Sequence, residues 1–267
     1  MKEAVIVSTA RTGMGKSFRG ALNDTEAPAM GGHAVKAAVE RAGIDPASVE
    51  DVIMGAAAQQ GTQSYNLGRL CSVAAGLPDT TAGMTMDRQC SSGLMSIAWA
   101  AKSIMCDEMD VAVAGGLESI SLVQTKHKNS YRNVSQTVTD IDPTAYIPMI
   151  ETAEIVSERY GISREAQDEY ALQSQMRVAA AQEAGLFNDE IVPFATRMSV
   201  FNKETKETSY QDVVLDRDEC NRPSTTLESL QGLAPVWKDG QWVKEGKFIT
   251  AGNASQLSDG ASASVLM

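Results

Sequence analysis

The sequence has few residues of the kinds that bind metals, cross-link chains or attract nucleic acids. Its 267 residues include four cysteines and two histidines, and the cysteines at positions 71, 90, 106 and 220 form no Cys-x-x-Cys pair. This composition predicts neither a disulfide framework nor a metal site. The formal net charge of −11 argues against a nucleic acid or an anionic membrane as a partner.

Long apolar runs are also missing. No stretch is long enough to span a bilayer, and the amino terminus enters an apolar strand at residues 4–8 with no sign of a signal or transit peptide. We therefore expect no membrane insertion and a cytoplasmic location, which suits unpaired cysteines. With 43% hydrophobic residues, the chain can bury a full core in one or two domains.

Strand-like and helix-like segments alternate over the first part of the chain. Strands are expected at 49–56, 81–86 and 111–114, and helices at 30–42, 66–75 and after Cys90. This alternation predicts an α/β fold with a mainly parallel sheet and helices on both faces. From residue 122 to 247 the chain is more polar, with helices expected at 149–160, 163–184 and near 226–233.

Cys90 stands between a predicted strand and a predicted helix. The helix is apolar on nearly every face except at Lys102, which predicts a buried helix. A thiol at its amino end is favoured as thiolate, the nucleophilic form, by free N–H groups and the helix dipole. The small residues Ser91, Ser92 and Gly93 leave room for a substrate to approach the sulfur. The alternative is that Cys90 is a small buried hydrophobe, as free cysteines usually are.

Other chemically suggestive residues are given structural interpretations. Residues 10–17 approach a phosphate-binding loop, but Ala10 replaces the first glycine, and Gly20 and Pro28 interrupt the helix that should follow. We expect no nucleotide site there. His33 is expected at the surface. Glu118 could orient a loop near the site or cap the next turn, and the structural role of capping is the one expected.

One further polar segment is predicted to be exposed. His127 lies among Lys126, Lys128 and Arg132, in what reads as a basic surface loop. Such a loop would help to attract an anionic ligand to an otherwise acidic protein.

Four ordered segments resemble the thiolases. The run Asp-Arg-Gln-Cys-Ser-Ser-Gly-Leu at 87–94 is similar to the family's nucleophile segment. Residues 114–121 resemble its glycine-glycine-x-glutamate-serine motif, 161–170 its loop-domain helix start, and 250–261 its threonine-alanine-glycine-asparagine-x-serine motif. The resemblance covers the whole chain. It implies acyl transfer through an acyl-cysteine at Cys90, in thiolytic cleavage of 3-ketoacyl-CoA or Claisen condensation of two acetyl-CoA.

The resemblance also implies domains and binding residues. Residues 1–121 and 248–267 would form the amino-terminal part of a layered thiolase-like fold, and 122–247 an inserted α-rich loop domain that binds CoA. Matched to the family by their positions in the sequence, Arg222 would lie near the CoA nucleotide and Trp237 beside the pantetheine arm. Met149 and Ser255 would line the tunnel that holds this arm. Guanidinium, indole and thioether groups suit these contacts. Without the resemblance, Arg222 reads as a solvated charge and Trp237 as ordinary core.

Three thiolase motifs do not occur in this chain: asparagine-glutamate-x-phenylalanine, glycine-histidine-proline, and the segment of the second cysteine. Neither histidine has a matching context. We therefore expect the base and the second acid/base to come from a carboxyl-terminal half of the fold. The resemblance also implies a homodimer or homotetramer, with acyl-CoA and CoA as substrate and product, no tightly bound cofactor and no metal.

Two positions depart from the family pattern, and two other functions remain open. Asp87 replaces a usual asparagine and Ile150 a common glycine, which predicts an altered acyl pocket. One alternative is a thiolase-like module that binds acyl-CoA or lipid without chemistry. The other is a ketoacyl synthase-type condensing enzyme, although such enzymes usually lack the long insertion seen here.

Overall fold

The computed structural model describes residues 2–267, which form two compact units. Unit 1 holds the chain up to residue 128 together with residues 187–220 and 257–267, and unit 2 holds residues 129–186 and 221–256. The sequence-based division at 121/122 and 247/248 differs from these bounds. It assigned 187–220 to the inserted domain, whereas this segment groups with unit 1.

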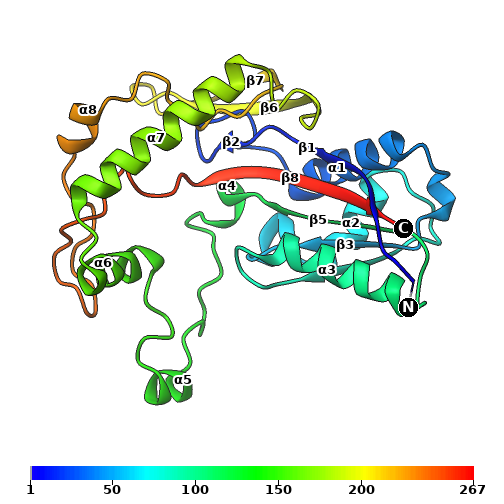
Figure 1. The fold of residues 1–267 in the computed structure, drawn as a ribbon, viewed down its shortest axis with the longest axis horizontal. Helices are drawn as coiled ribbons and strands as arrows, with labels where there is room; N and C mark the ends of the chain where they lie inside the picture. The colour runs from blue at the N-terminus through cyan, green and yellow to red at the C-terminus, as the bar shows by residue number, and fades with distance from the viewer. Residues whose placement is uncertain (1) are drawn as a thin grey trace. The chain divides into compact units, whose positions relative to one another are not determined.

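Unit 1 is built on a six-stranded sheet. Its strands are β1 (Ile6–Arg11), β2 (Gly15–Lys16), β3 (Asp51–Gly55), β4 (Ala82–Met86), β5 (Ala112–Glu118) and β8 (Ser258–Leu266). Their order is β1-β8-β5-β3-β4, with β2 paired to β8 beside that path (Figure 1). β3 is parallel to β4 and β5, and β8 is antiparallel to β1, β2 and β5. All strands except β8 therefore share one direction. The prediction of a mixed sheet is confirmed, with two parallel pairings made by β3 and three antiparallel pairings made by β8.

Helices cover both faces of this sheet, as predicted. They are α1 (Ala27–Ala42), α2 (Leu67–Ala74), α3 (Ser92–Met105) and the short α4 (Ile120–Val123), with 3-10 turns η1 (Pro46–Ser48) and η2 (Gly61–Gln63). Successive side chains of β3 point to opposite faces. Val52 and Met54 belong to the core cluster of α1 and α2, whereas Ile53 packs with Ala100 and Ile104 of α3.

The first helix begins earlier than its pattern suggested. α1 starts at Ala27 rather than Met30. Pro28 lies in its first turn, where a backbone N–H has no partner within the helix, so the missing N–H of proline costs no hydrogen bond. Pro28 therefore starts the helix instead of interrupting it. The helix ends at Gly43, as expected, and Gly43 adopts the left-handed conformation with φ of 67°.

A β-hairpin in unit 1 was missed by the sequence analysis. β6 (Phe194–Phe201) and β7 (Thr208–Leu215) pair antiparallel as a separate two-stranded sheet. The hairpin is held to the loop before α1, where the hydroxyls of Thr25 and Thr196 lie 2.7 Å apart and Asn23 Nδ2 donates to the Ser199 carbonyl at 2.8 Å. These contacts explain why the segment groups with unit 1.

Unit 2 is rich in helices, as predicted. They are α5 (Gln136–Ile141), α6 (Met149–Tyr160), α7 (Arg164–Glu183) and α8 (Leu227–Gln231). The return to the sheet comes later than expected. Residues 248–250 lie in unit 2, where Thr250 bridges to Pro235, and the sheet resumes only at Ser258. Across residues 2–267, no helix combines the length and apolarity needed to cross a membrane.

Candidate active site

The turn that carries Cys90 is fixed by its own side chains. Asp87 Oδ1 accepts a hydrogen bond from the Gln89 N–H at 2.6 Å, which closes an Asx turn. Ser92 Oγ donates to the Gln89 carbonyl at 2.6 Å and accepts from the Arg88 N–H at 2.8 Å. Gln89 adopts the left-handed conformation, with φ of 49°. Asp87, which departs from the family pattern, therefore has a structural role that asparagine would also fill.

Cys90 is exposed, and it lies where the sequence predicted, after the carboxyl end of β4 and one residue before Ser91, the N-cap of α3. Two glycines at neighbouring strand ends admit the start of this helix. A Cβ on Gly55 would lie 2.3 Å from the Ser92 carbonyl carbon, and one on Gly116 would lie 2.9 Å from the Gly93 Cα. The amino end of α3 therefore packs directly on the backbone of β3 and β5, which fixes the position of the thiol relative to the sheet.

The prediction of a fully buried α3 is wrong for this chain. One face is covered by the sheet through residues such as Ser96, Ala100 and Ile104. On the other side, Leu94 is 71% exposed and Trp99 is 45% exposed. The sequence pattern was correctly read as apolar all round, but the chain supplies a covering layer for only one face.

Glu118 has a structural role, but it organises the loop after β3 instead of capping the turn that follows it. Its carboxylate accepts from the N–H groups of Ala57 at 3.0 Å and Ala58 at 3.3 Å, and from Gln63 Nε2 at 2.6 Å. Gln63 is fully buried and its Oε1 accepts from the Ser119 N–H at 2.6 Å. This network ties the ends of β3 and β5 together at the sheet edge where β4 leads to Cys90.

Two of the resembling motifs meet inside unit 1. Ser121 Oγ donates to Asp259 Oδ2 at 2.5 Å, and the Ser121 N–H and Ser17 Oγ reach Asp259 Oδ1 at 2.9 and 3.2 Å. Asp259 is fully inaccessible. Burial raises the pKa of this carboxyl group, and the hydrogen bonds from Ser121 and Ser17 oppose that rise.

The segment that approaches a phosphate-binding loop is occupied by the protein's own carboxylates. Asp218 Oδ1 accepts from the Met14 N–H at 2.8 Å, and Glu219 Oε2 accepts from the Lys16 and Ala21 N–H groups at 3.0 and 3.1 Å. A phosphate would need these amide donors. The geometry therefore agrees with the expectation that no nucleotide binds there.

The two histidines differ in environment. His127 is exposed, as predicted. His33 is half-buried on α1 rather than at the surface, with its ring centroid 4.6 Å from that of Phe194 and its Nε2 buried without a hydrogen-bond partner. Burial lowers the pKa of His33, and contacts with the Val192 and Pro193 backbone partly oppose this. The hairpin that covers His33 is the element the sequence analysis missed.

Unit 2 contains two buried glutamates on α6. Glu151 Oε1 accepts from the N–H groups of Trp242 at 2.5 Å and Val243 at 2.9 Å. Glu154 accepts from the N–H groups of three consecutive residues, 247–249, at 2.7–3.1 Å. Burial by itself raises the pKa of Glu151, but the backbone donors outweigh it, and the pKa is lowered. The two side chains thereby hold the irregular segment 241–249 against the helix.

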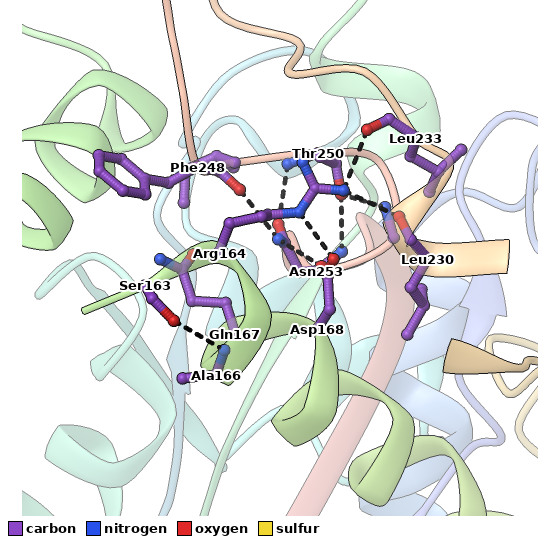
Figure 2. Close-up of polar contacts among 12 residues, drawn as sticks. Ser163, Arg164, Ala166, Gln167, Asp168, Leu230, Leu233, Phe248, Thr250 and Asn253 are labelled. Atoms are coloured by element: carbon purple, nitrogen blue, oxygen red, sulfur yellow. Dashed lines mark hydrogen bonds and ion pairs between the residues drawn. The ribbon is translucent and has the colours of Figure 1, made fainter. Parts of the chain in front are cut away.

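A second network in unit 2 explains the motif at 250–255. Asp168 is 0% exposed, and its carboxylate accepts from Arg164 Nε at 2.8 Å and from Asn253 Nδ2 at 3.0 Å. Figure 2 shows Arg164 placed between Asp168 and the carbonyls of Leu230 and Leu233, to which it donates at 2.8 and 3.0 Å. The segments that contain Asp168 (161–170) and Asn253 (250–261) were both singled out from the sequence, but their pairing was not, because the two residues lie far apart along the chain.

All four predicted CoA-binding residues lie in unit 2. Arg222 and Ser255 are exposed, and Met149 is 73% exposed at the start of α6. Trp237 is partly buried and its Nε1 donates to the Val243 carbonyl at 3.1 Å, beside the segment held by Glu151. Exposure makes the first three accessible to a ligand. Their assignment to CoA stays a prediction.

No metal centre emerges from the part of the chain that the structure describes. Within residues 2–267, no group of three or more histidine, cysteine, aspartate or glutamate side chains has a geometry that would hold a metal ion. All four cysteines are free.

Comparison with known proteins gives one consistent result. A family model described as "Thiolase, N-terminal domain" matches residues 4–267. The chain is 41% identical over 268 residues to the 3-ketoacyl-CoA thiolase of Bacillus subtilis (strain 168), and 40% identical over 278 residues to the acetyl-CoA acetyltransferase of Escherichia coli (strain K12). Each alignment covers 100% of this chain and 66% of the relative.

The structural comparison agrees. The crystal structure of the Bacillus anthracis acetyl-CoA acetyltransferase matches with a TM-score of 0.79 and 37% sequence identity, over 100% of this chain and 66% of that one. The chain thus spans about two thirds of the length of the relatives that it matches.

Proposed function

The chain belongs to the thiolase family, and on this premise we propose that it supplies the nucleophile for acyl transfer between CoA thioesters. The observation that carries the proposal is the position of Cys90, exposed in a tightly bonded turn directly before α3. Such a site gives a thiol both access and the positive end of a helix dipole. A cysteine buried only for packing would need neither.

The proposed reaction has two steps that share an acyl-cysteine. The Cys90 thiolate attacks the carbonyl carbon of an acyl-CoA, a C–S bond to Cys90 forms, and the C–S bond to CoA breaks, releasing CoA thiolate. The Cys90 N–H is our candidate donor to the oxyanion formed on the way. In the condensing direction the acyl group then passes to an acetyl-CoA carbanion. In thiolytic cleavage of a 3-ketoacyl-CoA the Cys90 thiolate instead attacks the 3-keto carbon, the C2–C3 bond breaks, the departing acetyl-CoA carbanion takes up a proton, and the acyl group then passes from Cys90 to CoA.

We assign recognition of CoA to unit 2. Arg222 suits a phosphate or an adenine face, Trp237 offers a flat apolar wall, and Met149 and Ser255 suit a thin pantetheine chain. Support comes from the exposure of Arg222, Met149 and Ser255 on one compact unit. CoA serves here as substrate and product, and the proposal includes no tightly bound cofactor.

We further propose that the carboxyl-terminal half of the thiolase fold covers the apolar face of α3 and supplies the base and second acid/base. The exposure of Leu94 and Trp99 supports this, since apolar side chains of this size at neighbouring helical turns favour a packed partner. We also propose a homo-oligomer and a cytoplasmic location. The edge strand β4, paired on one side only, offers a surface for a second copy, and four free cysteines suit a reducing compartment.

An exchange assay on the intact protein that carries this chain tests the nucleophile. Labelled CoA should exchange into acetyl-CoA without a second acyl substrate, because the acyl-cysteine forms and reverts. Cys90→Ala should abolish the exchange, and Cys106→Ala, which alters another exposed cysteine, should leave it intact. Exchange that survives in Cys90→Ala would remove Cys90 from the mechanism.

A further inference from the structure

The turn at residues 250–254 is closed by its own polar groups. Asn253 Oδ1 accepts from the Thr250 N–H at 2.8 Å, and Thr250 Oγ1 accepts from the Gly252 and Asn253 N–H groups at 3.2 and 3.3 Å. The Ala254 N–H donates to the Thr250 carbonyl at 3.0 Å. Thr250 is fully buried, whereas Ser255, which follows the turn, is exposed. The hydrogen bonds within the turn therefore fix the backbone from which the exposed Ser255 projects.

Asn253 connects this base to α7. Its Nδ2 donates both to Asp168 Oδ1 and to the Phe248 carbonyl, each at 3.0 Å, while its Oδ1 serves Thr250 (Figure 2). Only an amide side chain offers two donors and an acceptor in this arrangement. The isosteric aspartate would keep the acceptor, lose both donors, and place a second carboxylate against Asp168.

Asp168 in turn is anchored by Arg164. A fully buried carboxylate requires a charged partner with good hydrogen bonds, and Arg164 Nε provides it at 2.8 Å. The same guanidinium holds the carbonyls of Leu230 and Leu233. The side chains of these two leucines press on the turn, because a Cβ on Gly252 would lie 2.6 Å from both. Arg164 thus supports the turn by two routes, through Asp168 and through the leucines.

We propose that Arg164, Asp168 and Asn253 form a positioning relay that sets the affinity for CoA through the 250–255 turn. The inference rests on the proposed function, which assigns Ser255 to the pantetheine arm. None of the three touches the substrate in this account. Each acts on CoA through the conformation of the turn, so the relay controls KM for the acyl-CoA and leaves the reacting thiol unaffected.

The test uses Asn253→Asp, Asp168→Asn and the double variant in the intact protein, with Asn133→Asp as a matched control on an exposed loop of unit 2. Each single variant should raise KM for acetyl-CoA about tenfold, as expected for loss of a charge-assisted hydrogen bond, with little change in kcat. The double variant restores the pairing in reverse, because the new amide at position 168 would donate to the new carboxylate at position 253 while still accepting from Arg164. It should recover most of the lost affinity.

Several outcomes overturn the relay. KM in Asn253→Asp no higher than in Asn133→Asp would do so, as would an equal effect on kcat, or a double variant no better than the single ones. If Asn253→Asp fails to fold, Arg164→Lys gives the answer, since lysine keeps the charge but loses the fork that reaches the two leucine carbonyls. Amide hydrogen exchange at 250–255 should then quicken and KM should rise. Unchanged exchange contradicts the proposal.

Calorimetric titration of the unmodified protein with CoA separates this inference from the function on which it rests. If CoA does not bind, both the proposed function and the relay are wrong. If CoA binds equally to the unmodified protein and to Asn253→Asp, the function stands and the relay alone is removed.

Discussion

Gly55 at the end of β3 lies so close to Ser92 at the start of α3 that a Cβ on the glycine would be 2.3 Å from the serine carbonyl carbon. Through this contact, the sheet fixes how closely the start of α3, the helix that follows Cys90, packs against β3. A methyl group at position 55 would clash with the backbone of Ser92 and Gly93, which cannot rotate away as a side chain could. The start of α3 must therefore shift to admit it.

Gly55→Ala should therefore lower the free energy of unfolding by about 1–3 kcal/mol, as overpacking of a tight contact does. It should also slow alkylation of Cys90 by iodoacetamide, because the thiol moves with the helix start. Chemical denaturation and timed alkylation measure the two effects.

Gly260→Ala is the matched control for that substitution. Gly260 lies on β8 in the same unit, where an added Cβ would find its nearest neighbour at an ordinary 3.5 Å. It should alter stability and alkylation much less. Equal effects of the two substitutions would show that the contact between Gly55 and Ser92 has no special part in placing Cys90.

Glu118 gives the second prediction. Glu118→Gln puts an amide donor where three N–H donors converge, and it should cost about 1.5–3 kcal/mol of unfolding free energy, the range for hydrogen bonds to a charged group. Adding Gln63→Glu reverses the pair and should recover part of the loss, since the new carboxylate at position 63 would still accept from the Ser119 N–H. Urea unfolding of both variants checks this. A double variant less stable than the single one contradicts the pairing.

The strand, turn and helix around Cys90 could be predicted because their signals are local. Apolar periodicity marks β4 and α3, and the small residues after Cys90 mark the turn. The exposed face of α3 could not be predicted. A helix that is apolar on every side is expected to be covered on every side, but its sequence does not show whether the covering segments belong to the same chain.

Long-range pairs account for the other differences. The motif at 250–255 was visible, but nothing local indicates that Asn253 meets Asp168, or that Gln63 meets Glu118, because these partners are brought together only by the fold. The hairpin β6–β7 was missed because its strands mix polar with apolar residues and are largely exposed or half-exposed, so that neither strand reads as a buried apolar run. That omission also made His33 look like a surface residue.

The environment of Glu151 predicts that the stability of unit 2 falls in acid. Its folded-state pKa is lowered from the ordinary value of 4.5, so its stabilising effect is present above 4.5 and is lost as the pH falls through the folded-state value. The stability difference between the unmodified protein and Glu151→Gln should therefore shrink on acidification below 4.5. Glu169→Gln, on the exposed side of α7, is the control. A difference that stays constant with pH would contradict the assignment.

His33 predicts a separate pH effect near neutrality. Its folded-state pKa is lowered from 6.5, so the unfolded chain takes up a proton first, and stability is lost as the pH falls below 6.5. His33→Gln keeps a hydrogen-bond donor on α1 but does not titrate, and it should flatten the pH dependence of the melting temperature in this range. His127→Gln, at the exposed histidine, should leave that dependence unchanged. If His127→Gln flattened the pH dependence and His33→Gln did not, the buried, unpartnered Nε2 of His33 would not disfavour protonation of this histidine in the folded protein.

The most direct test of the account is to locate the acyl group. The intact protein is incubated briefly with acetyl-CoA, quenched in acid, digested, and analysed by peptide mass spectrometry. We predict one acetyl group on the peptide that contains Cys90 and none on the peptide of Cys106, which is also exposed. Equal acetylation of the two peptides, or a Cys90 peptide that stays unmodified while CoA binds, would contradict a nucleophilic role for Cys90.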